Sequence, residues 1–280
     1  MPPDGARALL AAASARLRAA GCETPDLDAR LLFQAATGLS REDLILAPHH
    51  VIATAQQARF EGFLQRREAR EPVSRILGER EFYGRPFRVT PDVLDPRPDT
   101  ETLVDAALAL MGERAQILDL GTGTGAIAVT LLAERPDSSG MAVDVSEAAL
   151  AVARDNAARL GVADRLTLVA GNWFSPVSGR FDIIASNPPY IPADEIAGLS
   201  PDVRNFDPAL ALLGGEDGLD PYRLIAAAAA AHLKPAGHVL VEIGAGQGPA
   251  IGQIFAGHGF ALRAAHADLG GHVRCLDFSA

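Results

Sequence analysis

The sequence predicts an α/β protein in which a mostly parallel sheet, covered by helices on both faces, follows a small N-terminal helical bundle. From about residue 100 onward, short apolar runs typical of strands alternate with longer stretches of helical periodicity. The first ~75 residues contain helical stretches and no convincing strand. At ~150 residues per domain, a chain of 280 residues is expected to form about two domains.

Composition and charge narrow the class of protein. Hydrophobic residues make up 48% of the chain and charged residues 21%, which excludes a disordered chain, a collagen and a disulfide-rich scaffold. The formal net charge of −10 argues against a basic surface that binds nucleic acid. Cys22 and Cys275 lie far apart with no CxxC spacing, so we expect reduced cysteines, a cytoplasmic location and no metal site.

Membrane and targeting signals are weak. Residues 8–15 are mostly apolar, but Arg16 and Arg18 follow at once and the apolar positions fall on one helical face, which favours an amphipathic helix over a cleaved signal. Residues 224–231 form an apolar run far shorter than the ~20 residues needed to cross a bilayer. We therefore expect no membrane partner.

The chain is expected to have three parts. Residues 1–75 form a helical bundle, residues 76–99 a hairpin and an extended linker broken by glycine and prolines, and residues 100–280 the sheet domain. The expected helices of the bundle lie at residues 4–20, 26–37, 41–47 and 53–70. The expected strands of the sheet lie at residues 116–120, 141–145, 166–171, 181–187, 238–244, 260–266 and 273–278. Helices are expected after the glycine run to about residue 135 and at residues 146–160, 219–232 and 247–257.

A glycine-rich run follows the first of these strands and opens a helix. Glycines there let a ligand approach the backbone closely, and the first N–H groups of the helix are free to bind it. Asp144 ends the next strand, where an acidic side chain can accept hydrogen bonds from two ribose hydroxyls. The sequence thus predicts a nucleoside-cofactor site built from Asp144 and from Gly121, Thr122, Gly123, Thr124 and Gly125.

The glycine spacing leaves two cofactor classes open. The looser form of the dinucleotide fingerprint accepts Ala126 at its third glycine position. S-adenosylmethionine has no pyrophosphate and carries a positive charge, so the acidic Asp119 at the start of the loop suits it better. The spacing favours S-adenosylmethionine without excluding a dinucleotide.

A second motif, Asn187-Pro188-Pro189-Tyr190, follows the fourth expected strand, at the end where open α/β sheets bind ligands. The prolines stiffen the turn and carry no N–H groups. The Asn187 side-chain carbonyl and the Pro188 main-chain carbonyl can therefore accept hydrogen bonds, and Tyr190 offers a flat face. This set suits a planar amino group attached to a π system: an adenine or cytosine amine, or a carboxamide.

These motifs resemble those of the Rossmann-like class I amino-methyltransferases. A longer pattern, over nearly the whole chain, resembles the peptide chain release factor glutamine methyltransferases (the HemK/PrmC family). It consists of Pro72-Val73, Ile76 to Gly78, Glu81 to Gly84, Phe87 to Val89, Val93 to Glu101, Asn172 to Phe174, Asn187 to Tyr190, Val203-Arg204, Leu213 to Asp220 and Asp268 to Arg274. The NPPY run alone is shared with DNA amino-methyltransferases, whereas its combination with the proline-rich linker is specific.

The resemblance implies a reaction. The methyl group of S-adenosylmethionine passes to the side-chain amide nitrogen of the glutamine in the Gly-Gly-Gln motif of class I release factors, which leaves S-adenosylhomocysteine. The N-terminal helices are implied to recognise the release factor. No direct nucleic-acid partner is implied.

The resemblance also implies roles for single residues. The glycine run surrounds the methionine part of the cofactor, Asp144 holds the ribose and Trp173 packs near the adenine. Asn187, between cofactor and substrate, acts with Pro188 and Tyr190 as the catalytic set. Pro189 joins these three in binding the glutamine. Arg97 and Glu101, in the linker, are implied to help close the site, although ordinary linker ion pairs explain them equally well.

Two positions depart from the family pattern: Asp95 replaces a hydrophobic residue, and Asn172 replaces an acid before Trp173.

Three other functions fit parts of the sequence. A nucleic-acid amino-methyltransferase shares NPPY and would use the arginines of residues 59–88, but the acidic net charge opposes it. A cofactor-binding module without catalysis is opposed by the intact motifs. A nicotinamide oxidoreductase lacks a hydride-transfer constellation.

Overall fold

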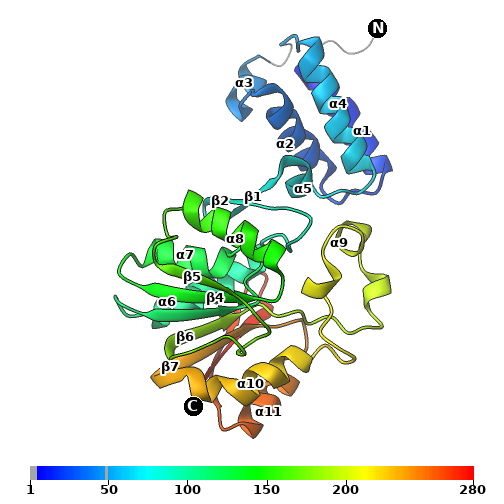
Figure 1. Cartoon of the computed structure of the whole chain (residues 1–280). Helices are drawn as coiled ribbons and strands as arrows, with labels where there is room; N and C mark the ends of the chain where they lie inside the picture. Colours follow the sequence, from blue (N-terminus) through cyan, green and yellow to red (C-terminus); the bar gives the residue numbers. More distant parts are fainter. Residues whose placement is uncertain (1–4, 48–49) are drawn as a thin grey trace. The chain divides into compact units, whose positions relative to one another are not determined.

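The computed structural model describes residues 5–47 and 50–280. It divides into two compact units (Figure 1). One, here called the helical unit, ends at Glu79 and also includes the separate segment Ser200–Phe206. The other, the sheet unit, contains Arg80–Leu199 and Asp207–Ala280. The sequence predicts a boundary after residue 75, whereas in the structure the unit ends at Glu79, and the hairpin from Arg80 onward and the linker belong to the sheet unit.

The helical unit packs around a small apolar core. Its helices are α1 (Ala6–Ala19), α2 (Pro25–Thr37), α3 (Arg41–Leu46), α4 (Thr54–Glu68) and α5 (Val73–Leu77). Phe33 of α2 meets Phe60 of α4 edge to face at 5.0 Å, with Leu17 of α1 buried in the same cluster. The four expected helices are confirmed to within two residues at each described end, and residue 4 lies outside the described residues. The short α5 was not expected.

An arginine pair ties the separate segment into the helical unit. Arg67 is 5% exposed and donates its Nε to Asp28 Oδ2 at 2.8 Å. Its Nη1 lies 2.8 Å from Asp202 in α9 (Pro201–Arg204), and Arg70 Nε lies 2.5 Å from the other oxygen of Asp202. Removing one partner of such a buried pair leaves an uncompensated charge, which is strongly destabilising.

The sheet unit contains a seven-stranded sheet in the order β5-β4-β3-β6-β7-β9-β8. The five strands from β5 to β7 are parallel, and β9 runs antiparallel to both β7 and β8. The bounds are β3 (Gln116–Leu120), β4 (Ser139–Asp144), β5 (Leu166–Ala170), β6 (Phe181–Ser186), β7 (Leu233–Glu242), β8 (Ala261–Ala267) and β9 (Val273–Ser279). This arrangement confirms the predicted fold class and all seven predicted strands.

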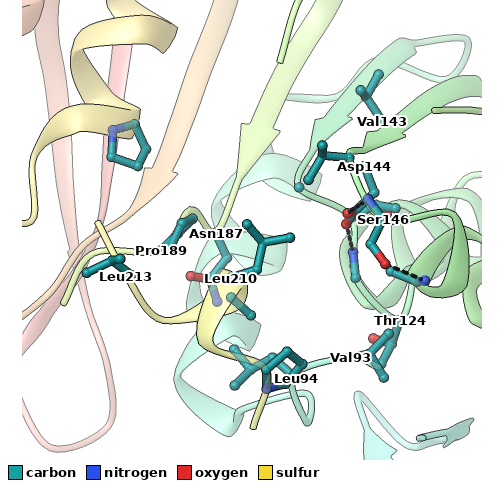
Figure 2. Close-up of a pocket in the computed structure, with 18 of the residues that line it drawn as sticks. Val93, Leu94, Thr124, Val143, Asp144, Ser146, Asn187, Pro189, Leu210 and Leu213 are labelled. Atoms are coloured by element: carbon teal, nitrogen blue, oxygen red, sulfur yellow. Dashed lines mark hydrogen bonds between the residues drawn. The ribbon is translucent and has the colours of Figure 1, made fainter. Parts of the chain in front are cut away.

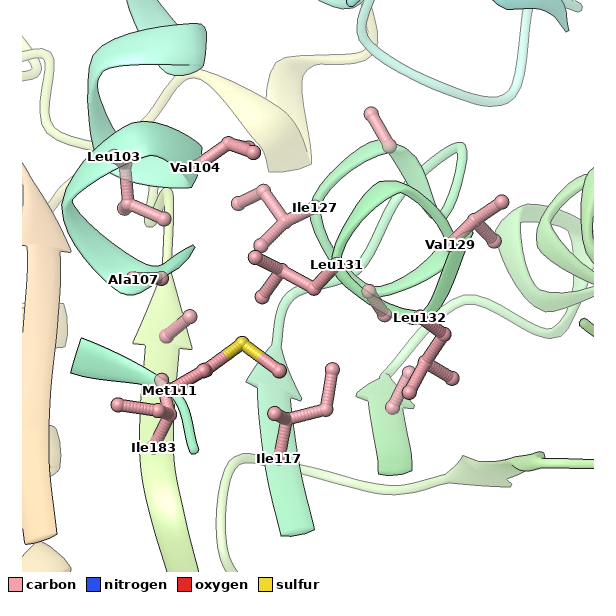
Figure 3. Packing of buried hydrophobic residues seen from close by; sticks show 14 of the residues in the cluster. Leu103, Val104, Ala107, Met111, Ile117, Ile127, Val129, Leu131, Leu132 and Ile183 are labelled. Atoms are coloured by element: carbon pink, nitrogen blue, oxygen red, sulfur yellow. The ribbon is translucent and has the colours of Figure 1, made fainter. Parts of the chain in front are cut away.

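Helices cover both faces of the sheet because successive strand residues point to opposite sides. On one side Ile117 of β3 and Ile183 of β6 pack under α6 (Glu101–Leu110), α7 (Ala126–Glu134) and α8 (Glu147–Arg159), as Figure 3 shows in part for α6 and α7. On the other side the neighbouring residues Leu118 and Ile184 pack under α10 (Asp220–His232) and α11 (Gly248–Gly257).

Two features of the sheet unit differ from expectation, the presence of one helix and the start of one strand. Helix α6 was not predicted, although Leu103, Val104 and Ala107 form its buried face at helical spacing. Strand β7 begins five residues before the expected start at residue 238, because an irregular pairing with β6 accommodates its first half. The expected hairpin is confirmed as β1 (Glu79–Phe82) and β2 (Arg85–Arg88). Short 3-10 helices lie at Pro98–Thr100, Ile196–Gly198 and Ala209–Ala211.

Candidate functional site

The site lies where the strand order reverses. From β3 the chain builds outward through β4 to β5, then returns to place β6 on the other side of β3. Leu120 at the end of β3 pairs with Ser186 at the end of β6, so the segments after these strands begin side by side. Open α/β sheets bind ligands at such a switch point, outside the carboxyl ends of the strands.

A cavity of about 650 Å³ occupies this position, within the range for small-molecule sites. Its wall brings together most of the residues predicted from the sequence (Figure 2). The predicted residues that line it are Gly121, Thr122, Gly123, Thr124, Asp144, Trp173, Asn187 and Pro189, together with Arg97 of the linker. Gly125, Pro188, Tyr190 and Glu101 do not line it.

The glycine loop and Asp144 form one hydrogen-bonded wall. Gly123 N–H donates to Asp144 Oδ2 and Ser146 N–H to Oδ1, each at 2.9 Å, so the carboxylate is fixed between the loop and α8. Gly121 has a φ of 73°, and the space where a Cβ would stand is open. Gly125 is different, because a Cβ there would meet Val129 at 3.2 Å. The structure therefore gives Gly125 a packing role between helices.

Asp119 lies beneath the loop and is 1% exposed. It accepts hydrogen bonds from Thr122 Oγ1 at 2.6 Å and from Ala128 N–H at 3.3 Å. Burial raises its pKa to about 6, against the opposing effect of these two bonds. Asp119 does not line the cavity, so the structure shows no direct contact between its carboxyl group and a ligand there. It organises the loop from below.

Trp173 lines the cavity with a strained backbone. Its φ is 50°, which is rare for a bulky residue and costs of order 1–3 kcal/mol. Its half-buried ring packs against the apolar cluster under α10 and α11. Such strain is found at binding sites, where the surrounding structure holds it. Asn172, the departure before it, also lines the cavity and is exposed.

The NPPY turn presents two carbonyl groups with no partner among the described residues. The Asn187 side chain donates Nδ2 to Thr100 Oγ1 at 3.1 Å, and its Oδ1 accepts no hydrogen bond from the described part of the chain. The Pro188 main-chain oxygen likewise accepts none within residues 5–47 and 50–280. Asn187 lines the cavity, so its Oδ1 is available there to a ligand that donates N–H groups, whereas Pro188 is buried and does not line the cavity.

Tyr190 turns away from the cavity and into the core. Burial raises the pKa of its hydroxyl, and its ring packs in the apolar cluster under α10 and α11. Its main-chain carbonyl accepts a hydrogen bond from Gln247 Nε2 at 2.9 Å. The structure thus supports a role for Tyr190 in holding the turn, and offers none in contacting a ligand in this cavity.

A glycine-containing loop packs directly against the NPPY turn. The sequence predicted no role for this loop in the site. Ile191 N–H donates to the Leu212 carbonyl at 3.0 Å, and Gly214 N–H donates back to the Ile191 carbonyl at 2.9 Å. A Cβ on Gly214 would lie 2.8 Å from the Pro189 oxygen. The run of small residues at 214–215 was the signal that could have revealed this close approach. Leu210 and Leu213 of the same loop line the cavity opposite the glycine run.

Gly214→Ala is expected to displace the NPPY turn, because the added methyl group meets main-chain atoms. We expect a loss of about 1–3 kcal/mol in the free energy of unfolding together with a loss of activity. Urea unfolding monitored by circular dichroism measures the first. Gly62→Ala, in the open interior of α4, is the control and should be neutral or stabilising. Equal stability of both variants would contradict the close contact.

Arg97 is the only basic residue in the described lining of the cavity, and it is paired. Its Nη2 lies 2.7 Å from the buried Asp207, which joins the linker to the loop beyond α9. Glu101 instead accepts the main-chain N–H of Tyr83 at 2.8 Å. Glu101 therefore anchors the hairpin.

No group of acidic, histidine or cysteine side chains suited to a metal ion occurs within the described residues.

No helix within residues 5–47 and 50–280 has the length and apolar character to cross a membrane.

The site as a whole is a half-enclosed cavity. One side carries a carboxylate, exposed loop backbone and an indole. The other side carries the side-chain carbonyl of Asn187 and an apolar rim. That arrangement suits a nucleoside-bearing ligand beside a small group with a donating NH2.

Comparison with known proteins agrees with this geometry. Residues 8–78 match the PrmC N-terminal domain, and residues 98–198 match the methyltransferase small domain. A release factor glutamine methyltransferase of Cereibacter sphaeroides is 53% identical over 267 residues, which cover 95% of each chain. One of Agrobacterium fabrum is 50% identical over 275 residues, covering 96% of this chain and 95% of the relative.

A solved methyltransferase structure from Pyrococcus furiosus is similar in fold, with a TM-score of 0.54 and 22% identity over 70% of this chain and 89% of that one. That likeness concerns the fold alone. The two close relatives extend over both the helical and the sheet units at half or more identical residues. The chain belongs to the release factor glutamine methyltransferase family.

Proposed function

We propose that the protein transfers a methyl group from S-adenosylmethionine to the side-chain amide nitrogen of the glutamine in the Gly-Gly-Gln motif of release factors. The observation that carries this proposal is the free acceptor Asn187 Oδ1 in the wall of a nucleoside-sized cavity, with the unpartnered main-chain carbonyl of Pro188 next to it in the same turn. The names of the close relatives supply the substrate. Because release factors act in translation, the proposed reaction is cytoplasmic.

The cavity fits S-adenosylmethionine on its chemistry. Asp144 has a half-buried carboxylate fixed by two N–H donors, which suits ribose hydroxyls. The open space over Gly121 lets a ligand chain lie against the loop backbone, and the Trp173 indole offers a surface for a base. When bound, the cofactor supplies an electrophilic methyl group on a sulfonium, whose leaving group is a neutral thioether.

The residues of this chain would act by position. An amide nitrogen is a weak nucleophile because its lone pair is delocalised into the carbonyl group. If Asn187 Oδ1 and the Pro188 carbonyl accept both of its hydrogens, the nitrogen is held in one orientation. Positioning of this kind contributes on the order of 7–11 kcal/mol in favourable cases. The same two oxygens stabilise the positive charge that develops on nitrogen.

The test is methylation of purified release factor with labelled cofactor, followed by mass spectrometry of the Gly-Gly-Gln peptide. We expect one added methyl group on the glutamine. A DNA duplex and an RNA hairpin are assayed in parallel under the same conditions. Labelling of nucleic acid with an unlabelled release factor would overturn the proposal in favour of a nucleic-acid amino-methyltransferase.

We also propose that the helical unit binds a second part of the release factor. It exposes apolar side chains at the end of α3: Ile45 is 68% and Leu46 83% exposed. A second contact raises the effective concentration of the substrate at the cavity.

The double change Ile45→Ser with Leu46→Ser is therefore expected to raise the KM for the whole release factor by about tenfold, a typical interface effect of ~1.4 kcal/mol. Methylation of a short Gly-Gly-Gln peptide should not change, because the peptide cannot reach a second site. Steady-state assays on both substrates measure this. Equal loss on both substrates would show that these residues only stabilise the fold.

A further inference from the structure

A buried carboxyl group reaches Asn187 from the sheet, and the proposed reaction leaves it without a role. Glu242, at the end of β7, is 3% exposed and does not line the cavity. Hydrogen bonds with the side chains of Thr100 and Asn187 lower the pKa of its carboxyl group, although its Oε2 has no partner among the described residues. Asn187 Nδ2 also donates to Thr100 Oγ1 at 3.1 Å. Thr100 is itself 4% exposed. Three polar side chains from separate segments therefore meet behind the NPPY turn.

The chemistry of this group selects one orientation of the Asn187 amide. An ionised carboxylate has acceptors only, whereas the two ends of an asparagine amide differ: one donates and the other accepts. With the carboxylate and the Thr100 hydroxyl oxygen behind it, the amide turns its NH2 inward. Its Oδ1 then faces the cavity, where it can accept a hydrogen bond from a substrate.

We propose that Glu242, together with Thr100, is a positioning residue that fixes the Asn187 side chain with its carbonyl oxygen toward the substrate amide. This inference rests on the proposed function, because the orientation matters only if the substrate donates an N–H group to Asn187. Glu242 does not touch the cavity, so its effect on the reaction passes entirely through Asn187.

The surroundings of Glu242 make its ionisation depend on pH near neutrality. Burial raises its pKa to about 7, although the Thr100 hydrogen bond works against this. Asp99 raises this pKa further, whereas Arg274 and the Asn187 hydrogen bond lower it. The other titratable groups that interact with it are Tyr190, Tyr222 and Cys275. A protonated carboxyl can donate to Asn187 Oδ1, so the selected orientation is lost at low pH.

The test compares Glu242→Gln with the wild-type enzyme. Glutamine has nearly the same shape but both donates and accepts, so Asn187 can adopt either orientation. We expect kcat to fall by about 10- to 100-fold, as for a misplaced catalytic group, with unchanged cofactor affinity. In the wild type, kcat should fall as the pH drops below about 7, and this acidic limb should disappear in Glu242→Gln.

Further variants separate positioning from folding. Thr100→Ser keeps the hydroxyl and should retain kcat, whereas Thr100→Val should lose it. Asp277→Asn removes another buried carboxylate, on the neighbouring β9, and should leave both kcat and the pH profile unchanged.

The stability of the fold gives a second measurement. The folded state keeps the Glu242 proton at a pH where the unfolded chain has lost it, so ionisation of Glu242 lowers the free energy of unfolding as pH rises toward 7. Glu242→Gln should therefore unfold at an equal or higher temperature than wild type at pH 8.

Three results would overturn the inference. Glu242→Gln could keep full kcat and the acidic limb, or it could lose cofactor affinity and thermal stability along with kcat, which would indicate a merely structural group. Loss of the limb without loss of kcat would also contradict it. A wild-type enzyme that does not methylate release factor would overturn the proposed function instead, and this inference with it.

Discussion

Asn187→Ala is expected to lose methyl transfer by about 100- to 1,000-fold in kcat while retaining most of its affinity for S-adenosylmethionine. The change removes one of the two acceptors that would hold the substrate amide, and losing one such preorganised group costs this much in other enzymes. Asp144 and the glycine loop, on the opposite wall, keep their own hydrogen bonds. Single-turnover assays with labelled cofactor measure the rate, and calorimetry measures the affinity.

The matched control is Asn205→Ala. Asn205 is an exposed amide outside the cavity lining, so its removal should leave both quantities unchanged. Full activity of the Asn187→Ala variant would remove this residue from the reaction, and with it the central part of the proposed function. A loss of cofactor affinity equal to the loss of rate would instead assign Asn187 to cofactor binding alone.

Asp144→Ala is expected to weaken S-adenosylmethionine binding by about 10- to 100-fold. Hydrogen bonds to a charged group contribute about 1.5–3 kcal/mol, and every 1.4 kcal/mol corresponds to a factor of ten in affinity. The change also frees the N–H groups of Gly123 and Ser146, so the loop loses its anchor as well as its acceptor. The dissociation constant from isothermal titration calorimetry measures the effect.

Two further measurements sharpen the Asp144 experiment. At saturating cofactor the variant should recover a large part of its kcat, because Asp144 lies away from the NPPY turn on the other wall of the cavity. Asp155→Asn changes an acid on the exposed side of α8, outside the cavity lining, and should bind cofactor normally. Unchanged affinity in the Asp144→Ala variant would contradict the ribose-binding role.

The strands and most helices could be predicted from the sequence because their signals are local. A buried parallel strand is a continuous apolar run, so β3 was located to the residue. Helix α6 was not predicted, although its buried positions follow helical spacing. Its first residue, Glu101, also belongs to the proline-rich linker motif, and the sequence around it was interpreted as linker. The start of β7 has no apolar signal and depends on a neighbouring strand for its irregular pairing.

The site was also predictable only in part, because only those of its residues that form contiguous motifs can be recognised locally in the sequence. The glycine loop and NPPY are contiguous motifs, so their residues could be named, and strand order accounts for their meeting. The support behind them is not contiguous: Thr100 and Asn187 are 87 positions apart, and Glu242 comes from yet another strand. Nothing in a local pattern distinguishes Gly125, which packs a helix, from Gly121, whose side opens to the cavity.

The ion pairs of Asp202 have a practical consequence for engineering this enzyme. The module that begins at the N-terminus is not one continuous piece of chain, since α9 supplies part of it from between the NPPY turn and the Leu210 loop. Deletion of residues 1–79 would remove Arg67 and Arg70 and leave the Asp202 carboxylate without these partners. Chimaeras between family members should therefore exchange residues 1–79 and 200–206 together, as a matched pair of grafts.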